Sequence, residues 1–274
     1  MLIYDIGSYE FAVYNSFSQL YKETLEYPVT AADMADCGSF IIATAGREHN
    51  GVALLYNDDL ELIARYKKSD YITDVAISED GEYAAITTLS VSGGDFIYKI
   101  IIYKPGLDSE AASVTAVGDY PVSLEYNGSG FTVLGTKGVY FYSITGEELG
   151  SYTGFDGELD LFTCDFGYAA LIIRQNAVGS ENKVVVLDVN GEVCYSAVID
   201  EKPEDISISD AGELYLLTTS HTVMIDIGRG TEKAKPTVVS ALRLFATGDE
   251  TALLCTPSSA DTIDFKKLAV IADD

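Results

Sequence analysis

Two stretches of the chain repeat one pattern of residues. "DVAISEDGEYAAITT" runs from Asp74 to Thr88, and "DISISDAGELYLLTT" runs from Asp205 to Thr219. In each, apolar residues alternate with other residues up to an acidic turn that contains glycine, and a nearly continuous apolar run follows. Alternation with a period of two is typical of a half-buried strand, and a short apolar run bounded by turn residues is typical of a fully buried one. Each copy therefore predicts two strands joined by a tight turn.

Related units recur along the whole chain about every 42 residues, and this period matches the number of residues in one blade of a β-propeller. One landmark is a glycine near the bend of each unit, at Gly38, Gly81, Gly130, Gly167, Gly212 and Gly248. A second, independent landmark is the last residue of an apolar strand, at Tyr14, Tyr56, Tyr103, Tyr142, Asp188 and Asp226. Two hairpins that alternate with one shared period are typical of four-stranded blades. We therefore predict an all-β fold, a β-propeller of four-stranded antiparallel blades, in a single domain over residues 1–274.

The spacing also predicts the number of blades. Five complete units cover residues 28–69, 70–118, 119–155, 156–200 and 201–240. Residues 1–27 hold what we expect to be the last three strands of a blade, and residues 241–274 the first three strands of another. Seven blades fit the length best, with one blade incomplete or built from both termini, and six or eight remain as alternatives. Closure through shared termini would remove exposed sheet edges.

The register of the repeat predicts which side chains lie buried between blades. A shift of one residue would turn the whole set outward, so the prediction is specific. The predicted buried residues are Val75, Ile77, Ala84, Ile86, Val133, Leu171, Val185, Ile206, Ile208, Leu214 and Leu216.

The composition narrows the classes of partner. The 274 residues carry a formal net charge of −26, from 43 acidic and 17 basic side chains. This charge repels phosphate backbones and anionic lipids, which disfavours nucleic-acid and membrane-surface binding, and it favours solubility or a cationic partner. No run approaches the roughly 20 apolar residues of a membrane span, and the N-terminus lacks the pattern of a signal peptide. Four dispersed cysteines, Cys37, Cys164, Cys194 and Cys255, predict free and mostly buried thiols.

No local motif of catalysis, phosphate binding or metal binding stands out. The sequence contains no G-x-S-x-G, no G-x-G-x-x-G and no calcium loop, and the acidic turns lack the spacing of oxygen ligands. Two histidines, His49 and His221, each fall between the second and third strands of a unit, without a metal-ligand partner nearby. We therefore predict no catalytic residue, no metal site and no cofactor.

The repeat sorts charged residues onto two ends of the sheets. In an up-and-down antiparallel sheet the first and third turns lie at one end, and the second loop and the connectors lie at the other. The first end collects Asp58, Asp59, Glu61, Glu79, Asp80, Glu82, Glu147, Glu148, Asp210, Glu213, Asp249 and Glu250. The other collects basic and amide residues in longer loops, which offer hydrogen-bond donors to a ligand. We predict a ligand-binding face there, formed by Arg47, His49, Asn50, Tyr71, Arg174, Asn176 and His221.

Segments of the first hundred residues resemble a known family. "LIYDIGSYEFAVY" from Leu2 and "YITDVAISEDG" from Tyr71 carry most of the likeness, which extends over nearly the whole chain. The chain resembles a family of uncharacterised, WD40-like propeller proteins of Gram-positive anaerobes. The resemblance implies an extracytoplasmic propeller that follows an N-terminal membrane helix. The sequence given does not contain that helix, so we expect it to be either a trimmed ectodomain or a shorter relative of the family.

Two functions remain open at this point. The first is a non-enzymatic binding or scaffold propeller at the cell surface, a monomer whose partner is a protein or a cell-envelope polymer. It would meet the membrane only through an N-terminal anchor. The alternative is a lactonase-like hydrolase or lyase with a divalent metal held in the channel by side chains from different blades, which leave no local motif.

Overall fold

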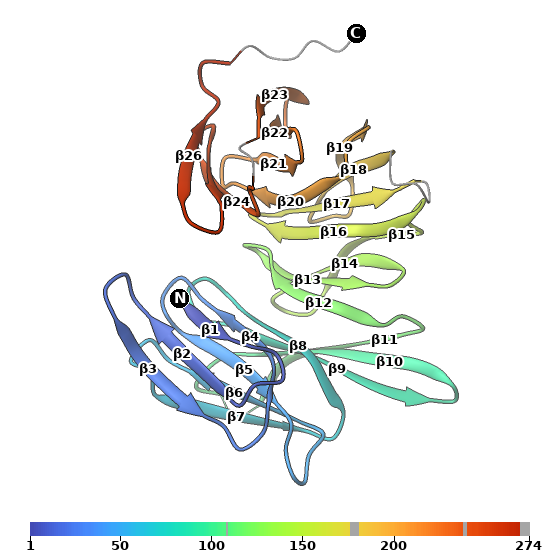
Figure 1. Ribbon diagram of the computed structural model, residues 1–274. Helices are drawn as coiled ribbons and strands as arrows, with labels where there is room; N and C mark the ends of the chain where they lie inside the picture. The colour runs from blue at the N-terminus through green and yellow to red at the C-terminus, as the bar shows by residue number, and fades with distance from the viewer. Residues whose placement is uncertain (108, 176–180, 238–239, 269–274) are drawn as a thin grey trace. The chain divides into compact units, whose positions relative to one another are not determined.

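The computed structural model describes all residues except 108, 176–180, 238–239 and 269–274. Its regular secondary structure in these residues consists of β-strands joined by turns (Figure 1). The described residues contain no helix long and apolar enough to cross a membrane. The chain divides into two compact units, residues 1–151 and residues 152–274, each described here by itself.

The first unit contains four antiparallel sheets in chain order. The first sheet has three strands, β1 (Leu2–Tyr4), β2 (Glu10–Tyr14) and β3 (Gln19–Thr24). The second has four, β4 (Val29–Met34), β5 (Phe40–Thr44), β6 (Gly51–Tyr56) and β7 (Leu62–Lys68). The third has β8 (Tyr71–Ile77), β9 (Ala84–Ser92), β10 (Asp95–Tyr103) and β11 (Glu110–Val117). The fourth has β12 (Pro121–Tyr126), β13 (Gly130–Gly135), β14 (Gly138–Ser143) and β15 (Glu148–Thr153), whose last residues cross the boundary.

The second unit contains three further sheets of the same kind. The first of them has four strands, β16 (Glu158–Asp165), β17 (Tyr168–Arg174), β18 (Asn182–Asp188) and β19 (Val193–Ile199). The next has β20 (Pro203–Ile208), β21 (Glu213–Thr218), β22 (His221–Asp226) and β23 (Thr231–Pro236). The last has three strands, β24 (Arg243–Gly248), β25 (Thr251–Cys255) and β26 (Ala260–Asp264).

These sheets confirm the all-β class and the repeat. The five four-stranded sheets fall inside the five predicted units, and the three-stranded sheets stand at the two predicted ends. Seven sheets agree with the predicted number of seven, and each has its strands in sequential order. The single domain, and closure of the two end sheets into one blade, remain predictions.

Apolar side chains fill the space between consecutive sheets within each unit. The first strands of successive sheets lie side by side, as β4, β8 and β12 do in the first unit and β16, β20 and β24 in the second. Ile41 and Leu55 of one sheet share a buried cluster with Val75 and Ile86 of the next. Every residue that the register of the repeat predicts as buried is buried, from Leu171 at 0% exposure to Ile206 at 8%. The predicted register is therefore confirmed.

The aspartates that open the two repeated stretches perform one structural task. Asp74 on β8 accepts a hydrogen bond from the backbone N–H of Leu124 on β12, at 2.8 Å. Asp205 on β20 accepts one from the N–H of Leu244 on β24, also at 2.8 Å. Both aspartates follow a bulge in their strand, which breaks the ladder just before them. Each carboxylate therefore links one sheet to the next through a backbone donor of the neighbouring first strand.

The glycines of the repeat serve two purposes. Gly38, Gly81, Gly167 and Gly212 have positive φ angles, as a tight turn requires, and so does Gly248. Gly130 is different, since it lies inside β13, where an added Cβ would come within 2.0 Å of the carbonyl oxygen of Tyr142. The turn of that unit instead uses Gly128, at φ 86°. The landmark glycine at position 130 thus marks a close backbone approach rather than the bend.

Two sequence-based expectations about burial are wrong in part. Glu213, which the repeat places among the acidic residues at the turn end of the sheets, is buried rather than exposed there: it is 7% exposed, and its carboxylate accepts hydrogen bonds from Tyr215, Ser209 and the N–H of Glu250. None of the four cysteines forms a disulfide, as predicted, but Cys37 and Cys194 are exposed and only Cys164 is fully buried. Both cases depend on which neighbours cover a position, and the periodicity of one strand does not contain that information.

The buried isoleucines of the repeat provide a stability test. We expect Ile77→Ala and Ile208→Ala each to lower the free energy of unfolding by about 2–5 kcal/mol, because each leaves a cavity between two sheets. Ile63→Ala is the control, since Ile63 is 46% exposed, and it should change stability far less. Urea denaturation measures all three, and equal midpoints for the isoleucine variants and the control would contradict this packing.

Asp74 provides a test of pH dependence. Burial raises the pKa of Asp74 to about 6, although two backbone N–H groups oppose that rise. The folded protein therefore holds the proton more tightly than the unfolded chain, so this stabilisation is complete below about pH 4 and is lost as pH rises through about 6. We expect a rise from pH 4 to pH 7 to cost the wild type about 2 kcal/mol more than it costs Asp74→Asn.

Urea denaturation at a series of pH values measures that difference. Asp59→Asn, in an exposed turn of the same unit, is the control and should follow the wild type. A stability difference between the wild type and Asp74→Asn that stays constant with pH would contradict the assignment.

Candidate functional site

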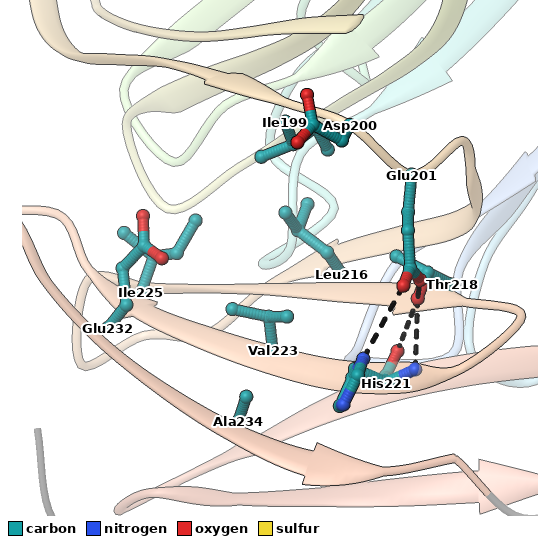
Figure 2. Close-up of a pocket in the computed structure, with 10 residues that line it drawn as sticks. All are labelled: Ile199, Asp200, Glu201, Leu216, Thr218, His221, Val223, Ile225, Glu232 and Ala234. Atoms are coloured by element: carbon teal, nitrogen blue, oxygen red, sulfur yellow. Dashed lines mark hydrogen bonds and ion pairs between the residues drawn. The ribbon is translucent and has the colours of Figure 1, made fainter. Parts of the chain in front are cut away.

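A groove opens between two consecutive sheets of the second unit. It has a volume of about 310 Å³ and lies between the end of β19 and the outer three strands of the sheet β20–β23. We call it the acidic groove. Its lining consists of Ile199, Asp200, Glu201, Leu216, Thr218, His221, Val223, Ile225, Glu232 and Ala234 (Figure 2).

The floor of the acidic groove is apolar because of the strand register. Leu216 on β21 pairs with Val223 on β22, and Val223 pairs with Ala234 on β23. Directly paired residues point to the same side of a sheet, so these side chains form one apolar row. Ile199 at the end of β19 faces this row from the neighbouring sheet (Figure 2).

One end of the groove is polar. Glu201, in the connector between β19 and β20, points toward Thr218 and His221 (Figure 2). Its carboxylate accepts hydrogen bonds from the hydroxyls of Thr218 and Ser220, and Nδ1 of His221 lies 3.5 Å from it. The Ser220 hydroxyl also lies 2.8 Å from that same nitrogen. The tight turn between β21 and β22 brings Thr218, Ser220 and His221 together around the carboxylate.

The geometry of this cluster suits anchoring rather than nucleophile activation. In a serine-type triad one histidine nitrogen contacts the nucleophile and the other contacts the carboxylate. Here Ser220 and Glu201 both contact Nδ1 of His221. Hydrogen bonds from the Ser220 and Thr218 hydroxyls lower the pKa of Glu201, so it carries its negative charge more readily than an ordinary glutamate.

Two further carboxylates border the groove. Asp200 is exposed at the end of β19. Glu232 on β23 accepts a hydrogen bond from the Tyr195 hydroxyl on β19, which joins the two sheets. With Glu201, the groove therefore has an apolar floor and three carboxylates at its edge, an arrangement that suits a cation attached to an apolar group.

A second cavity contains two of the residues predicted to bind a ligand. Arg47 and His49, in the loop between β5 and β6, line a cavity of about 400 Å³ in the first unit. Tyr27 and Arg65 line it too, together with the acidic Glu26. His221 lies in the acidic groove of the other unit, so three of the predicted binding residues line two different cavities.

The other predicted residues have varied surroundings. Asn50 donates a hydrogen bond to the carbonyl oxygen of Ser69, and Arg174 forms an ion pair with Glu158 at 2.5 Å. Tyr71, at the start of β8, is 64% exposed. Asn176 lies outside the described residues. That these residues form one binding face remains a prediction.

Most residues of the acidic groove carry no sequence signal of a binding site. Glu201 lies in a charged connector, "DEKPED", that reads as a solvated turn, and Leu216 and Val223 read only as core residues. In the described part of the chain no group of three or more His, Cys, Asp or Glu side chains could hold a metal ion.

Solved structures similar to this chain are β-propellers. A chain of the Kuenenia stuttgartiensis hydrazine synthase matches with a TM-score of 0.60 at 12% identity, over 93% of this chain and 89% of that one. Hsv2 of Kluyveromyces lactis matches with a TM-score of 0.59 at 12% identity, over 93% and 86%. A chain of the mitotic checkpoint complex matches with a TM-score of 0.56 at 10% identity, over 89% and 79%. At such identities the likeness shows the fold alone, and with the seven sheets it defines an all-β protein of the β-propeller class.

The family follows from the sequence itself. The chain belongs to the DUF5711 family, a family of unknown function whose model matches residues 1–265. Among curated proteins none matches this sequence. The predicted resemblance to an uncharacterised propeller family is thereby confirmed, whereas its source in Gram-positive anaerobes and its membrane anchor remain predictions.

The cluster around Glu201 provides a local test. Ser220→Ala removes one of the two hydroxyl donors to the carboxylate, so we expect the pKa of Glu201 to rise toward its ordinary value. Carboxyl-carbon NMR of Glu201 against pH measures this pKa. Thr219→Ala, one position earlier in the same turn, should leave it unchanged. A Ser220→Ala variant with the wild-type titration would contradict the hydrogen bonding described here.

Proposed function

We propose that this protein is a non-enzymatic binding or scaffold propeller at the cell surface, and that it recognises a segment of a partner protein through the acidic groove. The observation that carries the proposal is the apolar row of Leu216, Val223 and Ala234, with three carboxylates at its edge. Apolar pockets with a few placed charges are common recognition sites. The partner segment would place an apolar side chain on this row and a lysine or arginine beside the carboxylates.

Charge supports a basic partner over other classes. The chain as a whole carries −26, so a cationic segment is attracted from a distance as well as at the groove. Glu201 is held in place by hydroxyl donors, so little side-chain freedom is lost when a cation binds next to it. A nucleic acid would meet repulsion at the same surface.

The class of fold is consistent with this proposal. A propeller offers a rigid framework that presents grooves between sheets, and a chain of the mitotic checkpoint complex, a protein assembly, has a similar fold. The placement of this protein outside the membrane, as a monomer tethered by an N-terminal anchor in its longer form, is part of the proposal. It rests on the family resemblance of the N-terminal segments.

Selection from a random heptapeptide display library tests the proposal directly. We expect the enriched peptides to carry Lys or Arg within two residues of Leu, Ile, Met or Phe, and to bind more weakly as salt is raised. Asp200→Lys should weaken their binding about tenfold, because it reverses one charge at the groove. Glu192→Lys makes the same change in the exposed turn between β18 and β19 and should have less than a twofold effect. Enrichment of acidic peptides, or equal loss in both variants, would contradict the proposal.

A further inference from the structure

A second groove occupies the equivalent place between two sheets of the first unit. It has a volume of about 410 Å³ and lies between the end of β7 and the outer three strands of the sheet β8–β11. We call it the lysine groove. Its polar lining includes Lys68, Asp70, Thr88, Lys99, Ser113 and Thr115.

The strand registers show that the two grooves correspond residue by residue. Ile86 pairs with Val75 and Ile101, just as Leu216 pairs with Ile206 and Val223. Thr88 lies two residues after Ile86 on β9, and Thr218 lies two residues after Leu216 on β21. Lys99 lies two residues before Ile101 on β10, and His221 lies two residues before Val223 on β22. Thr88 next to Lys99 therefore matches Thr218 next to His221.

The connectors correspond as well. Asp70 lies two residues before Ile72, which pairs with Thr88, and Glu201 lies two residues before Pro203, which pairs with Thr218. In the acidic groove the Glu201 carboxylate accepts a hydrogen bond from Thr218. Aspartate is one methylene shorter, and no hydrogen bond between Asp70 and Thr88 is found in the described residues. A carboxylate of the chain itself therefore accepts a hydrogen bond from the threonine in the acidic groove, but not, among the described residues, in the lysine groove.

The threonine of the lysine groove is left with an unmet hydrogen bond. Thr88 is 1% exposed, and its hydroxyl has no hydrogen-bond partner among the described residues. A buried polar group without a partner is unfavourable and rare in folded proteins. An acceptor supplied from outside the chain would satisfy it.

The charges of the groove favour an anionic acceptor. Lys68 is paired with Glu110 at 2.8 Å. Lys67 and Lys99 also line the groove, and within the described part of the chain neither lies in an ion pair. Glu110, which also lines the groove, is neutralised by Lys68, so the ammonium groups of Lys67 and Lys99 against the carboxylate of Asp70 leave a local positive charge in a chain that is strongly acidic overall.

We propose that the lysine groove binds a hydroxylated carboxylic acid of the size of a hexuronate. The ligand carboxylate accepts a hydrogen bond from Thr88 and lies beside Lys99, in the position that Glu201 takes beside Thr218 and His221. A single negative charge matches the single excess positive charge of the site. Ser113 and Thr115 on β11 provide hydroxyls for the ligand's own hydroxyl groups.

Titration with D-glucuronate, followed by calorimetry, tests this site, with D-glucose and inorganic phosphate as comparison ligands. We expect saturable binding of one glucuronate per chain and at least tenfold weaker binding of the other two. Thr88→Val and Lys99→Met should each weaken glucuronate binding at least fivefold. Lys104→Met is the matched control, since Lys104 lies just beyond β10, where it pairs with Glu82. It should leave the affinity unchanged.

The pair Asp70→Glu and Asp70→Asn gives a sharper test. Asp70→Glu extends the carboxylate toward Thr88, as in the acidic groove, so it should reduce glucuronate binding at least tenfold. Asp70→Asn removes a competing charge and should bind glucuronate as well as the wild type or better. Unfolding midpoints of all variants confirm that they fold.

Absence of glucuronate binding, preference for phosphate or glucose, or equal losses in Lys104→Met and Lys99→Met would each overturn the proposal. So would full binding by Asp70→Glu. Because the peptide selection concerns a groove in the other unit, the two proposals stand or fail separately.

Discussion

The structure depends on the burial of apolar sheet faces between consecutive sheets within each unit. A sheet of four short strands with apolar residues on both faces is not stable by itself in water, because its apolar surface stays exposed. Stacking solves this problem, and the clusters that join Ile41 and Leu55 to Val75 and Ile86 show the result. A repeat of one unit along the sequence is the form that such a fold requires.

Stacking alone leaves the sheets free to slide, and specific polar contacts fix their positions. Asp74 and Asp205 each bind a backbone N–H of the next first strand, and Asp33 does the same for Ile77. Glu213 adds a similar link to Glu250. Such bonds to charged acceptors are strong, and partial burial excludes competing water. The acidic character of the chain is therefore in part structural, and it does more than keep the molecule in solution.

The same arrangement of strands produces a groove at the edge of consecutive sheets, and single residues decide its character. Leu216, Val223 and Ala234 give one groove an apolar floor. In the corresponding groove Ser113 takes the place of Ala234 and Lys99 the place of His221, and both make that groove polar. The connector carboxylate of Glu201 accepts a hydrogen bond from Thr218 in one groove, whereas the hydroxyl of Thr88 in the other has no partner among the described residues. A repeated scaffold can in this way carry different sites at equivalent places.

The sequence by itself determined the class of fold, the boundaries of the five complete repeats and the buried face of the strands whose register it predicted, and it favoured seven sheets over six or eight. Periods of two residues and of about 42 residues are local or regular properties, so they can be read along the chain. Only the tertiary structure decided which polar residues meet. Glu201 and His221 are brought together by a connector and a turn, Glu213 is covered by its neighbours, and the hydroxyl of Thr88 is buried without a partner among the described residues. Such contacts depend on positions in space that no spacing in the sequence records.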